Sequence, residues 1–568
     1  MGGKMLINRI RTLMFILFLA EFQAISQVGN ILAFCPLQDM TFVVPSERFQ
    51  KIQDAIDEAR ENCIINIKSG VYFENIRIFQ RKSIKIIGEG NSTVIMGGEG
   101  QNVIEVHYSS NITLMNFLVN ASKANMWGIY IILSCNINLI NVTVMNGYRG
   151  VYFWDASRCF LRNNRLAKNV YNFEVWGLTP LHFHHDIDTS NTVNGQPIYY
   201  LVNQNNFRVP SNAGYVAVIN SSGALVTGLN LTNNGQGVLL AYTSNTRLEN
   251  IYVSNNVRGV HMVVCSNVTI ASSKIEKCGE GILLISSSNN RVFKNNIIQG
   301  KYGIELSYSI FLSERCEGND ICQNNIKDND VGLLLFGSKH NNFTNNNLMK
   351  NKFGVYINNS SDNIFFRNNF IDNAVHVKVF DDLSSNIWNR DYPFGGNNWS
   401  GYSGPDVYCG SSQNEIGGDL IGDEPYVINP KNVDKYPLIP LSIDFVYQPL
   451  TPKVMETVNF TGIVRTPLYD VISWYWEISD GSFYYGRSVL HKFSQDGCFN
   501  VTLIVCDSRG VISVLTKDVV VSSFKGEERG PSIDVFRVFA VAFLLACFFI
   551  LWFLIYKRRN LRKQKLKC

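Results

Sequence analysis

Residues 150–169 read GVYFWDASRCFLRNNRLAKN, and residues 281–300 read GILLISSSNNRVFKNNIIQG. Both segments begin with glycine, have apolar residues at the first and third positions after it, and contain paired asparagines. Glycines that open such segments recur about every 22 residues wherever the chain is uninterrupted, and they are Gly128, Gly150, Gly237, Gly259, Gly281, Gly303, Gly332 and Gly354. A fixed period of this length indicates stacked units that share a core.

The residues within each repeat predict short β-strands. Apolar and polar side chains alternate briefly, and asparagine or serine interrupts every run before a helix could form. Asparagines recur at the thirteenth or fourteenth place, as at Asn163, Asn295, Asn345 and Asn368, where stacked repeats would align their amides in a ladder. The sequence therefore predicts an all-β fold, a parallel β-helix with three strands and about 22 residues per coil over residues 45–440.

Three further features refine this prediction. A leucine-rich repeat has an overlapping period but needs a leucine frame, whereas valine, isoleucine, asparagine and serine dominate here. Residues 50–62 (QKIQDAIDEAREN) have helical periodicity and precede the first repeat, so we expect a helix that caps the open end of the coil. Counting back one period from Gly128 places the preceding repeat at Val106.

The positive charge of the chain is concentrated at its two ends. The 568 residues carry a formal net charge of +5, yet residues 27–556 contain 41 basic and 45 acidic residues. Net charge therefore excludes nucleic-acid binding of the kind that depends on a basic body. Thirteen cysteines are too few for a disulfide scaffold, and the sequence leaves open whether Cys316 pairs with Cys322 or Cys35 with Cys63.

Both ends of the chain carry targeting features. Residues 1–26 have the pattern of a signal peptide, with basic residues, a short apolar core and two small residues, Ala24 and Ser26. Residues 538–556 are nineteen consecutive apolar residues, which predicts one transmembrane helix over 535–556, after a stalk at 523–534 and before a basic tail at 557–568. The positive-inside rule then places the tail in the cytoplasm and the ectodomain outside the cell membrane. Thirteen N-x-S/T sequons are compatible with an exported glycoprotein.

Several motifs resemble known families. GGNNW (395–399), IGDEPYVI (421–428), VDKYPL (433–438) and DIDTSNTVNGQPIYY (186–200) are similar to segments of the NosD family of right-handed, pectin-lyase-like β-helices, as seen in archaeal surface proteins. This resemblance implies a right-handed coil, and it adds copper or metal handling as one functional alternative. Residues 445–522 resemble a PKD domain, an immunoglobulin-like β-sandwich, through WEISDG (476–481) and HKF (491–493).

The strand after each repeat glycine carries the candidate binding residues. Its second and fourth residues must point away from the core, which aligns Tyr130, Tyr152, Trp154 and Trp176 on one outer face. Aromatic rings side by side on a rigid surface suit the apolar faces of sugars, so these four residues are predicted to bind a glycan. Further along, the same face is too apolar for water, and we expect an insertion at about 178–212 to cover it.

Other polar residues are candidates for catalysis or metal binding. The catalytic candidates are Glu174, His261, Glu305 and Asp155. Glu174 and Glu305 lie some six coils apart, roughly 29 Å, whereas glycoside hydrolysis needs carboxylates about 5–9.5 Å apart. If residues 182–188 (HFHHDID) are extended, one face carries His182, His184, Asp186 and Asp188, which would suit zinc or copper. A bound metal ion is an option that the sequence does not require.

Three functions remain open on this basis. The first, which the sequence favours, is a membrane-anchored, non-enzymatic surface protein that binds or organises extracellular glycans or envelope polymers and contacts envelope proteins. The second is a β-helical polysaccharide lyase, epimerase or hydrolase that uses the four catalytic candidates. The third is a NosD-like accessory protein that handles copper or another metal through residues 182–188.

Overall fold

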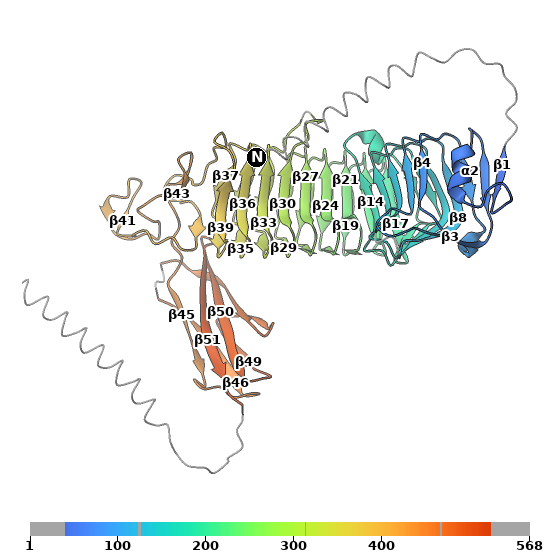
Figure 1. Cartoon of the computed structure of the whole chain (residues 1–568). Helices are drawn as coiled ribbons and strands as arrows, with labels where there is room; N and C mark the ends of the chain where they lie inside the picture. The colour runs from blue at the N-terminus through green and yellow to red at the C-terminus, as the bar shows by residue number, and fades with distance from the viewer. Residues whose placement is uncertain (1–39, 123–125, 313, 466–467, 524–568) are drawn as a thin grey trace, which may run out of the picture. The chain divides into compact units, whose positions relative to one another are not determined.

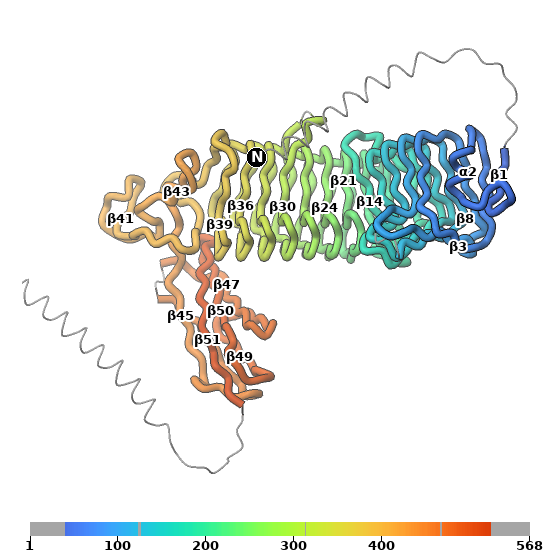
Figure 2. Tube along the Cα trace, in the orientation of Figure 1, coloured from blue at the N-terminus to red at the C-terminus, as the bar shows by residue number. Residues whose placement is uncertain are grey.

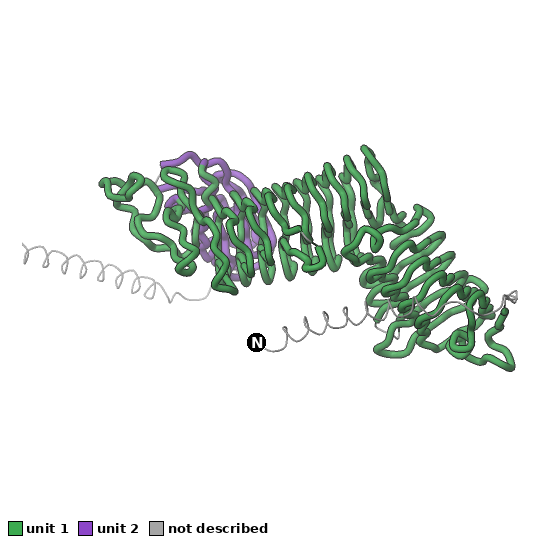
Figure 3. The backbone as a smooth tube through the Cα atoms, turned by 90° about the horizontal axis from the view of Figure 1, so that it is seen from above, with its two compact units in different colours: residues 1–440, 509–511 green, residues 441–508, 512–568 purple. Residues whose placement is uncertain are grey.

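The computed structural model describes residues 40–122, 126–312, 314–465 and 468–523. The expected signal peptide, the expected membrane span with its basic tail, and Cys35 lie outside these ranges. Within them, no helix has the length and apolar character that a membrane crossing requires. The chain divides into two compact units (Figure 3): unit 1 ends at Pro440 and also includes Arg509–Val511, and unit 2 begins at Leu441.

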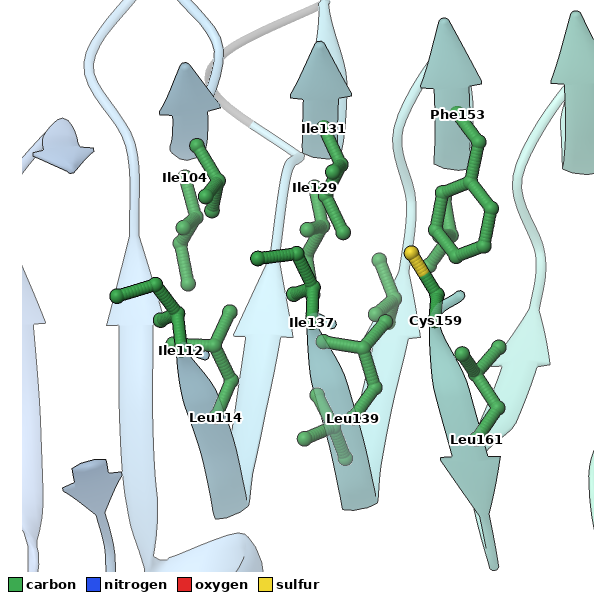
Figure 4. Close-up of a cluster of buried hydrophobic side chains, with 14 of the residues drawn as sticks. Ile104, Ile112, Leu114, Ile129, Ile131, Ile137, Leu139, Phe153, Cys159 and Leu161 are labelled. Carbon is green, nitrogen blue, oxygen red and sulfur yellow. The ribbon is translucent and has the colours of Figure 1, made fainter. Parts of the chain in front are cut away.

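Unit 1 is a parallel β-helix, as predicted (Figure 1 and Figure 2). Strands one coil apart pair in parallel and in register, so side chains at matching positions stack from coil to coil. Inside the coil, for example, Leu139 lies between Leu114 and Leu161 (Figure 4). Each coil thus buries its apolar residues against its neighbours, which is why the repeat needs no other core.

The coils form two consecutive stacks. The first stack has an outer five-stranded sheet of β4 (Ile76–Phe79), β7 (Ile104–His107), β9 (Trp127–Ile132), β11 (Arg149–Trp154) and β14 (Tyr171–Trp176). Its other sides consist of β1 (Thr41–Val44), β2 (Ile64–Ile67), β3 (Gly70–Phe73), β5 (Lys85–Ile87), β6 (Thr93–Met96), β8 (Thr113–Asn120), β10 (Asn138–Met145), β12 (Phe160–Arg162), β13 (Arg165–Ala167), β15 (Asp186–Ile187) and β16 (Thr192–Val193).

The second stack has the three strands per coil that the sequence predicts. One column contains β17 (Gln196–Val202), β18 (Tyr215–Ile219), β21 (Gln236–Ala241), β24 (Arg258–Val263), β27 (Glu280–Ile285), β30 (Tyr302–Ser307), β33 (Val331–Phe336), β36 (Phe353–Asn358) and β39 (Val375–Val379). The second contains β19 (Leu225–Thr227), β22 (Arg247–Glu249), β25 (Thr269–Ala271), β28 (Arg291–Phe293), β31 (Asp320–Cys322), β34 (Asn342–Thr344) and β37 (Ile364–Phe366). The third contains β20 (Asn230–Thr232), β23 (Tyr252–Ser254), β26 (Lys274–Glu276), β29 (Asn296–Ile298), β32 (Asn325–Lys327), β35 (Asn347–Met349), β38 (Asn369–Ile371) and β40 (Asn398–Trp399).

The insertion lies between the two stacks. It contains the 3₁₀ helix η2 (Pro180–Phe183) and β15, and the chain reverses where β16 pairs antiparallel with β17. Leu178 and Phe183 pack in one cluster with Leu239, Val263 and Ile285, which belong to the outer face of the second stack. The prediction that the insertion covers this face is therefore confirmed for these coils, whereas Phe336 further along remains 40% exposed.

Asparagine ladders run through the second stack. The Nδ2 atoms of Asn295, Asn324 and Asn346 each donate to the next Oδ1, ending at Asn368, over 3.0 Å per bond. Asn163 and Asn345, which were expected in such a ladder, instead adopt left-handed φ values of 56° and 53° at the preceding turn position. The two asparagines of each pair therefore have different roles. The first adopts the left-handed turn, which asparagine tolerates, and the amide of the second forms hydrogen bonds with buried backbone groups.

A helix covers the first coil, as expected. α2 (Ile52–Glu58) is shorter than the predicted 50–62 and buries Ile52 and Ile56. The carboxylate of Glu74 accepts hydrogen bonds from the backbone N–H groups of Ile52 and Gln53, at 3.0 and 3.1 Å, and so satisfies the helix start.

Of the two disulfide hypotheses, the structure tests only Cys316–Cys322, because Cys35 lies outside the described residues. Cys63, Cys316 and Cys322 are all free thiols. Cys316 is fully buried and lies near the carbonyl oxygens of Leu284 and Ser307, at 3.5 and 3.4 Å, so its sulfur points into the coil. The proposed Cys316–Cys322 pair is therefore wrong, and the structure supplies no partner for Cys63 among the described residues.

The end of unit 1 and all of unit 2 complete the fold. Unit 1 closes with two short hairpins, β41 (Tyr408–Cys409) with β42 (Glu415–Ile416) and β43 (Tyr426–Asn429) with β44 (Asn432–Asp434). Unit 2 is the predicted β-sandwich, in which one sheet contains β45 (Ile443–Gln448), β46 (Thr457–Val464) and β49 (Ser488–Lys492). The other sheet contains β47 (Val471–Ile478), β48 (Phe483–Tyr485), β50 (Gly497–Asp507) and β51 (Ile512–Val521), and Trp476 is fully buried between the sheets.

Candidate functional site

The outer face of the five-stranded sheet aligns the predicted aromatic residues in two columns. Tyr130, Tyr152 and Glu174 lie opposite one another on β9, β11 and β14, and Trp154 lies opposite Trp176 in the neighbouring column. The vertical alignment inferred from the repeat period is therefore confirmed. The same columns continue to β7 and β4, where Glu105 precedes Tyr130 and Arg77 precedes Glu105.

The aromatic side chains pack mainly against one another. The rings of Tyr130 and Tyr152 are stacked with centroids 5.4 Å apart, and Trp127 contacts both rings with its edge. Tyr130 and Tyr152 are only 6% and 7% exposed, whereas Trp154 is 36% exposed. Burial raises the pKa of both tyrosines, which keeps their hydroxyl groups protonated. The expected row of four open ring faces is therefore reduced to Trp154, supported by the buried tyrosines.

Trp176 is occupied by residues of the second stack. Its ring stacks on the imidazole of His261 at 5.1 Å between centroids, and the guanidinium of Arg258 lies 4.4 Å from its centroid. Both contacts come from β24, which follows the whole insertion in the chain. Trp176 therefore belongs to the junction of the two stacks, and we remove it from the proposed sugar-binding surface.

A hollow of about 800 Å³ lies at the other end of this face. It is lined by Gln53, Asp57, Asn75, Ile76, Arg77, Phe79, Arg81, Gly100, Gln101, Asn102, Glu105 and Met126. The sequence analysis missed these residues because the coil before Gly128 is longer than the later repeats: Val106 pairs with Ile131, not with Gly128. The alternation of apolar and polar residues in IEVH (104–107) matches that of the strand with Ile129 and Ile131. Aligning the two strands by this alternation, and not by the 22-residue period, places Glu105 opposite Tyr130.

The hollow is rich in groups that can bind hydroxyls. The amide of Asn102 donates to Glu105 Oε1 at 2.7 Å, and His107 Nε2 lies 3.4 Å from Glu105 Oε2. Burial lowers the pKa of His107, so its imidazole is neutral at pH 7 and leaves the charge of Glu105 in place. The guanidinium of Arg77 lies over the ring of Phe79 at 5.0 Å.

The candidate catalytic residues are not gathered in one site. Glu174 is 1% exposed, and Arg149 Nε and Arg258 Nη1 lie 2.5 and 3.0 Å from its two carboxylate oxygens. His261 is fully buried, and burial next to Arg258 lowers its pKa well below the usual value. Glu305 lies two coils beyond His261 on the same column, and burial raises its pKa. Glu174 and His261 are thus held as uncharged or ion-paired parts of the interior.

Asp155, the fourth candidate, forms a pair with His182. Their Oδ1 and Nδ1 atoms are 2.9 Å apart, and the two side chains are 26% and 25% exposed. Asp155 follows Trp154 directly, and His182 comes from η2 of the insertion. Gly177 makes room for the pair, because a Cβ atom there would lie 2.3 Å from the Cβ of His182. This polar pair therefore borders the exposed Trp154.

The predicted metal cluster is wrong in its geometry. Residues 182–188 are not extended, since His182 lies in η2 and only Asp186–Ile187 forms a strand. The carboxylates of Asp186 and Asp188 contact Arg162, at 2.8 and 3.1 Å, and His182 turns toward Asp155. His184 is exposed. Across the described ranges, no three His, Cys, Asp or Glu side chains gather as metal ligands.

The comparisons with protein families agree with the two motifs. Residues 189–404 match the family model described as periplasmic copper-binding protein (NosD), and residues 443–522 match the model of the PKD domain. The resemblances to NosD and to PKD domains are thereby confirmed for these two ranges. No curated protein matches the chain.

Solved structures that resemble the chain share little sequence with it. Carbohydrate-binding modules from a β-sandwich superfamily are 25% identical over 15% of this chain and 36% of their own, about a third of that structure, with a TM-score of 0.14. A double mutant of the periplasmic alginate epimerase AlgG is 12% identical over 64% of this chain and 77% of its own, with a TM-score of 0.25. Pectate lyase Pel9A is 12% identical over 57% and 78%, with a TM-score of 0.23. Similarities of this extent carry no conclusion about activity.

The copper named in the family description does not fit the residues found here. Copper prefers imidazole, thiolate and thioether ligands. Burial raises the pKa of Cys159, Cys265 and Cys316 to about 12, so these thiols stay protonated. Imidazoles do not replace them: His185 and His261 are buried, His182 is bound to Asp155, and no three His, Cys, Asp or Glu side chains of the described ranges gather where they could hold a metal ion. We therefore derive no metal chemistry for the described part of the chain.

Proposed function

We propose that unit 1 binds extracellular glycans through the outer face of the sheet β4–β14, here called the aromatic face and defined by Arg77, Glu105, Tyr130, Tyr152 and Trp154. The observation that carries this proposal is the exposed ring of Trp154, fixed by two buried tyrosines, on the same sheet whose β4 and β7 end borders a polar hollow of about 800 Å³. An aromatic ring on a rigid support can stack on a sugar, and nearby carboxylates and amides can accept or donate hydrogen bonds.

Binding without turnover is the better-supported activity. Of the four catalytic candidates, Glu174 and Asp155 lie closest to Tyr152 and Trp154 in the chain or across the strands. Both carboxylate oxygens of Glu174 are bound by arginines. A carboxylate held in this way is neither a free base nor an acid that could donate a proton. The remaining carboxylate at this face, Asp155, is paired with His182 at 2.9 Å.

The location at the membrane is part of the proposal and rests on the sequence. Residues 1–26 and 535–568 have the composition of a signal peptide and of a membrane span with a basic tail. We expect the β-helix outside the cell, where glycans and envelope proteins would be its partners. Protease treatment of intact cells should remove the β-helix and leave the tail, and protection of the whole chain would contradict this topology.

Glycan binding can be tested with the full chain in detergent. A glycan array identifies ligands, and titration calorimetry then compares the wild type with Trp154→Ala. We expect a loss of affinity of about tenfold, because a stacked aromatic contributes about 0.5–1.5 kcal/mol in addition to the apolar area that it buries. Phe73→Ala on β3 is the matched control, since Phe73 is 65% exposed and lies outside the five-stranded sheet. Absence of any bound glycan, or equal losses in both variants, would overturn the proposal.

A further inference from the structure

The charges of the aromatic face indicate which class of glycan it would bind. We propose that the ligand is an uncharged, hydroxyl-rich polysaccharide and not a polyanion such as a polyuronate. This inference rests on the proposed function and concerns the same surface. It follows from how the cationic and anionic side chains of the face are engaged.

The arginines of the face are directed to carboxylates of the protein. Arg149 is bound by Glu174 at 2.5 Å, and Arg258 is bound by Glu174 at 3.0 Å and by Glu280 at 3.1 Å. These side chains are at most 21% exposed, so a ligand would have to displace a buried ion pair to reach either guanidinium.

The arginines that line the hollow also have carboxylates of the protein as neighbours. Arg81 donates to the backbone carbonyl of Asp57 at 3.0 Å and lies 3.8 Å from the carboxylate of the same residue. Arg77 is stacked on Phe79 and is the direct cross-strand neighbour of Glu105. Each positive charge in the hollow is therefore accompanied by a negative charge, and none stands as an isolated anion-binding group among the residues that line it.

Two carboxylates at the aromatic face are more exposed than Glu174: Glu105 lies opposite Tyr130, and Asp155 follows Trp154 in the chain. Glu105 and Asp155 are 27% and 26% exposed. Glu105 contacts an amide and an imidazole and is the cross-strand neighbour of Arg77, whereas Asp155 contacts an imidazole. Both act on Tyr130: burial first, and then the negative charges of Glu105 and Asp155, raise the pKa of its hydroxyl, and the nearby Arg149 opposes this shift only in part. These two partly exposed carboxylates offer hydrogen-bond acceptors to the hydroxyl groups of a neutral sugar, and their negative charges repel a polyanion.

A binding series tests this inference. The full chain in detergent is titrated with oligomers of β-1,4-linked glucose and mannose, and with galacturonate and guluronate oligomers of equal length, at low and at high NaCl concentration. We expect the best neutral oligomer to bind at least tenfold more tightly than any uronate, with less than a twofold change between the two salt concentrations. Tighter binding of a uronate that weakens with salt would overturn the inference while leaving glycan binding intact.

Charge variants provide the second test. Asp155→Asn and Glu105→Gln should each weaken the neutral oligomer threefold to tenfold, because an amide accepts fewer hydrogen bonds than a carboxylate. Glu105→Lys should raise affinity for the uronate oligomers at low salt. Glu249→Gln on β22 is the control, since Glu249 pairs with Arg247 at 2.7 Å on a different sheet. Neutral binding that is unchanged in both amide variants would contradict the inference, whereas loss of all binding in Trp154→Ala alone tests the proposed function.

Discussion

Glu174, on the last strand of the first stack's outer sheet, accepts a hydrogen bond from Arg258, on β24 of the second stack, although the two residues are 84 positions apart in the chain. The oxygen and nitrogen atoms are 3.0 Å apart, and the side chains of Glu174 and Arg258 are 2% and 14% exposed. Arg149 binds the other oxygen of Glu174 from within the first stack. One carboxylate therefore joins two β-helical stacks that do not share an outer sheet.

A side chain satisfies backbone hydrogen bonds at this junction. β14 is the end strand of its sheet, and the amide of Gln236 donates to the carbonyl of Val175 at 2.7 Å and accepts from its N–H at 3.3 Å. Gln236 is fully buried. Its amide thus replaces part of a missing strand, which protects an open sheet edge from solvent and from pairing with other chains.

Replacing the central carboxylate should weaken this junction. Glu174→Gln removes the negative charge between two buried arginines, and we expect the free energy of unfolding to fall by about 3–5 kcal/mol. Urea denaturation of the full chain, followed by tryptophan fluorescence, measures the change. Glu249→Gln is the matched control on the surface, with an expected change of at most about 1 kcal/mol. Equal effects of the two substitutions would show that the buried ion pairs do not stabilise the junction.

The close approach of His182 to Gly177 predicts a steric effect. In Gly177→Ala the new methyl group would lie 2.3 Å from His182 Cβ, so η2 must move and the contact with Asp155 should be lost. We expect a destabilisation of about 1–3 kcal/mol. In a His182→Ala background the same alanine should cost less, because the crowded side chain is absent. An additive double-mutant cycle would contradict the proposed contact.

The asparagine ladder predicts a local loss of stability. Asn346→Ala leaves the amide of Asn324 without its Oδ1 acceptor and removes the donor to Ile321 O, at a cost of about 1–3 kcal/mol. Asn342→Ala, an exposed position on β34 of the same coil, should cost at most about 0.5 kcal/mol. Thermal unfolding of the two variants checks this difference. Similar melting temperatures would mean that the ladder bonds are replaced by water.

The buried imidazole of His185 predicts a pH dependence. Burial lowers its pKa to about 3, while Nδ1 accepts from the Cys159 N–H and Nε2 contacts the His182 carbonyl. The unfolded chain takes up a proton near pH 6.5 and the folded protein does not until about pH 3, so stability falls as the pH decreases between these values. The slope from this group is about 1.4 kcal/mol per pH unit.

His185→Gln should remove that part of the slope. Urea denaturation at pH 4, 5, 6 and 7 gives the difference between variant and wild type, in which contributions from other buried groups cancel. We expect the variant to be less stable at pH 7 and its disadvantage to shrink toward pH 4. A difference that does not depend on pH would mean that burial does not lower the pKa of His185 in the folded protein.

The sequence predicted the repeat length of the coil and which side chains lie on its inner and outer faces. The glycine period and the alternation of apolar residues predicted which side chains of β9, β11 and β14 share a face, and the register of Tyr130 with Tyr152 agrees. The motifs predicted the β-sandwich that begins at Leu441. The 22-residue count failed at the first coils. The coil before Gly128 is longer than 22 residues, so the count did not align Glu105 with Tyr130 and did not predict the hollow.

The amino-acid sequence by itself determined the repeating β-helix, because each coil depends on local alternation and on contact with a similar neighbour, and both can be counted along the chain. Only the tertiary structure decided which polar residues are available for binding. Glu174 and Trp176 belong to the outer face by position, yet the second stack buries them through Arg258 and His261. That burial depends on where the insertion turns the chain, which is a long-range packing outcome that no period in the sequence encodes.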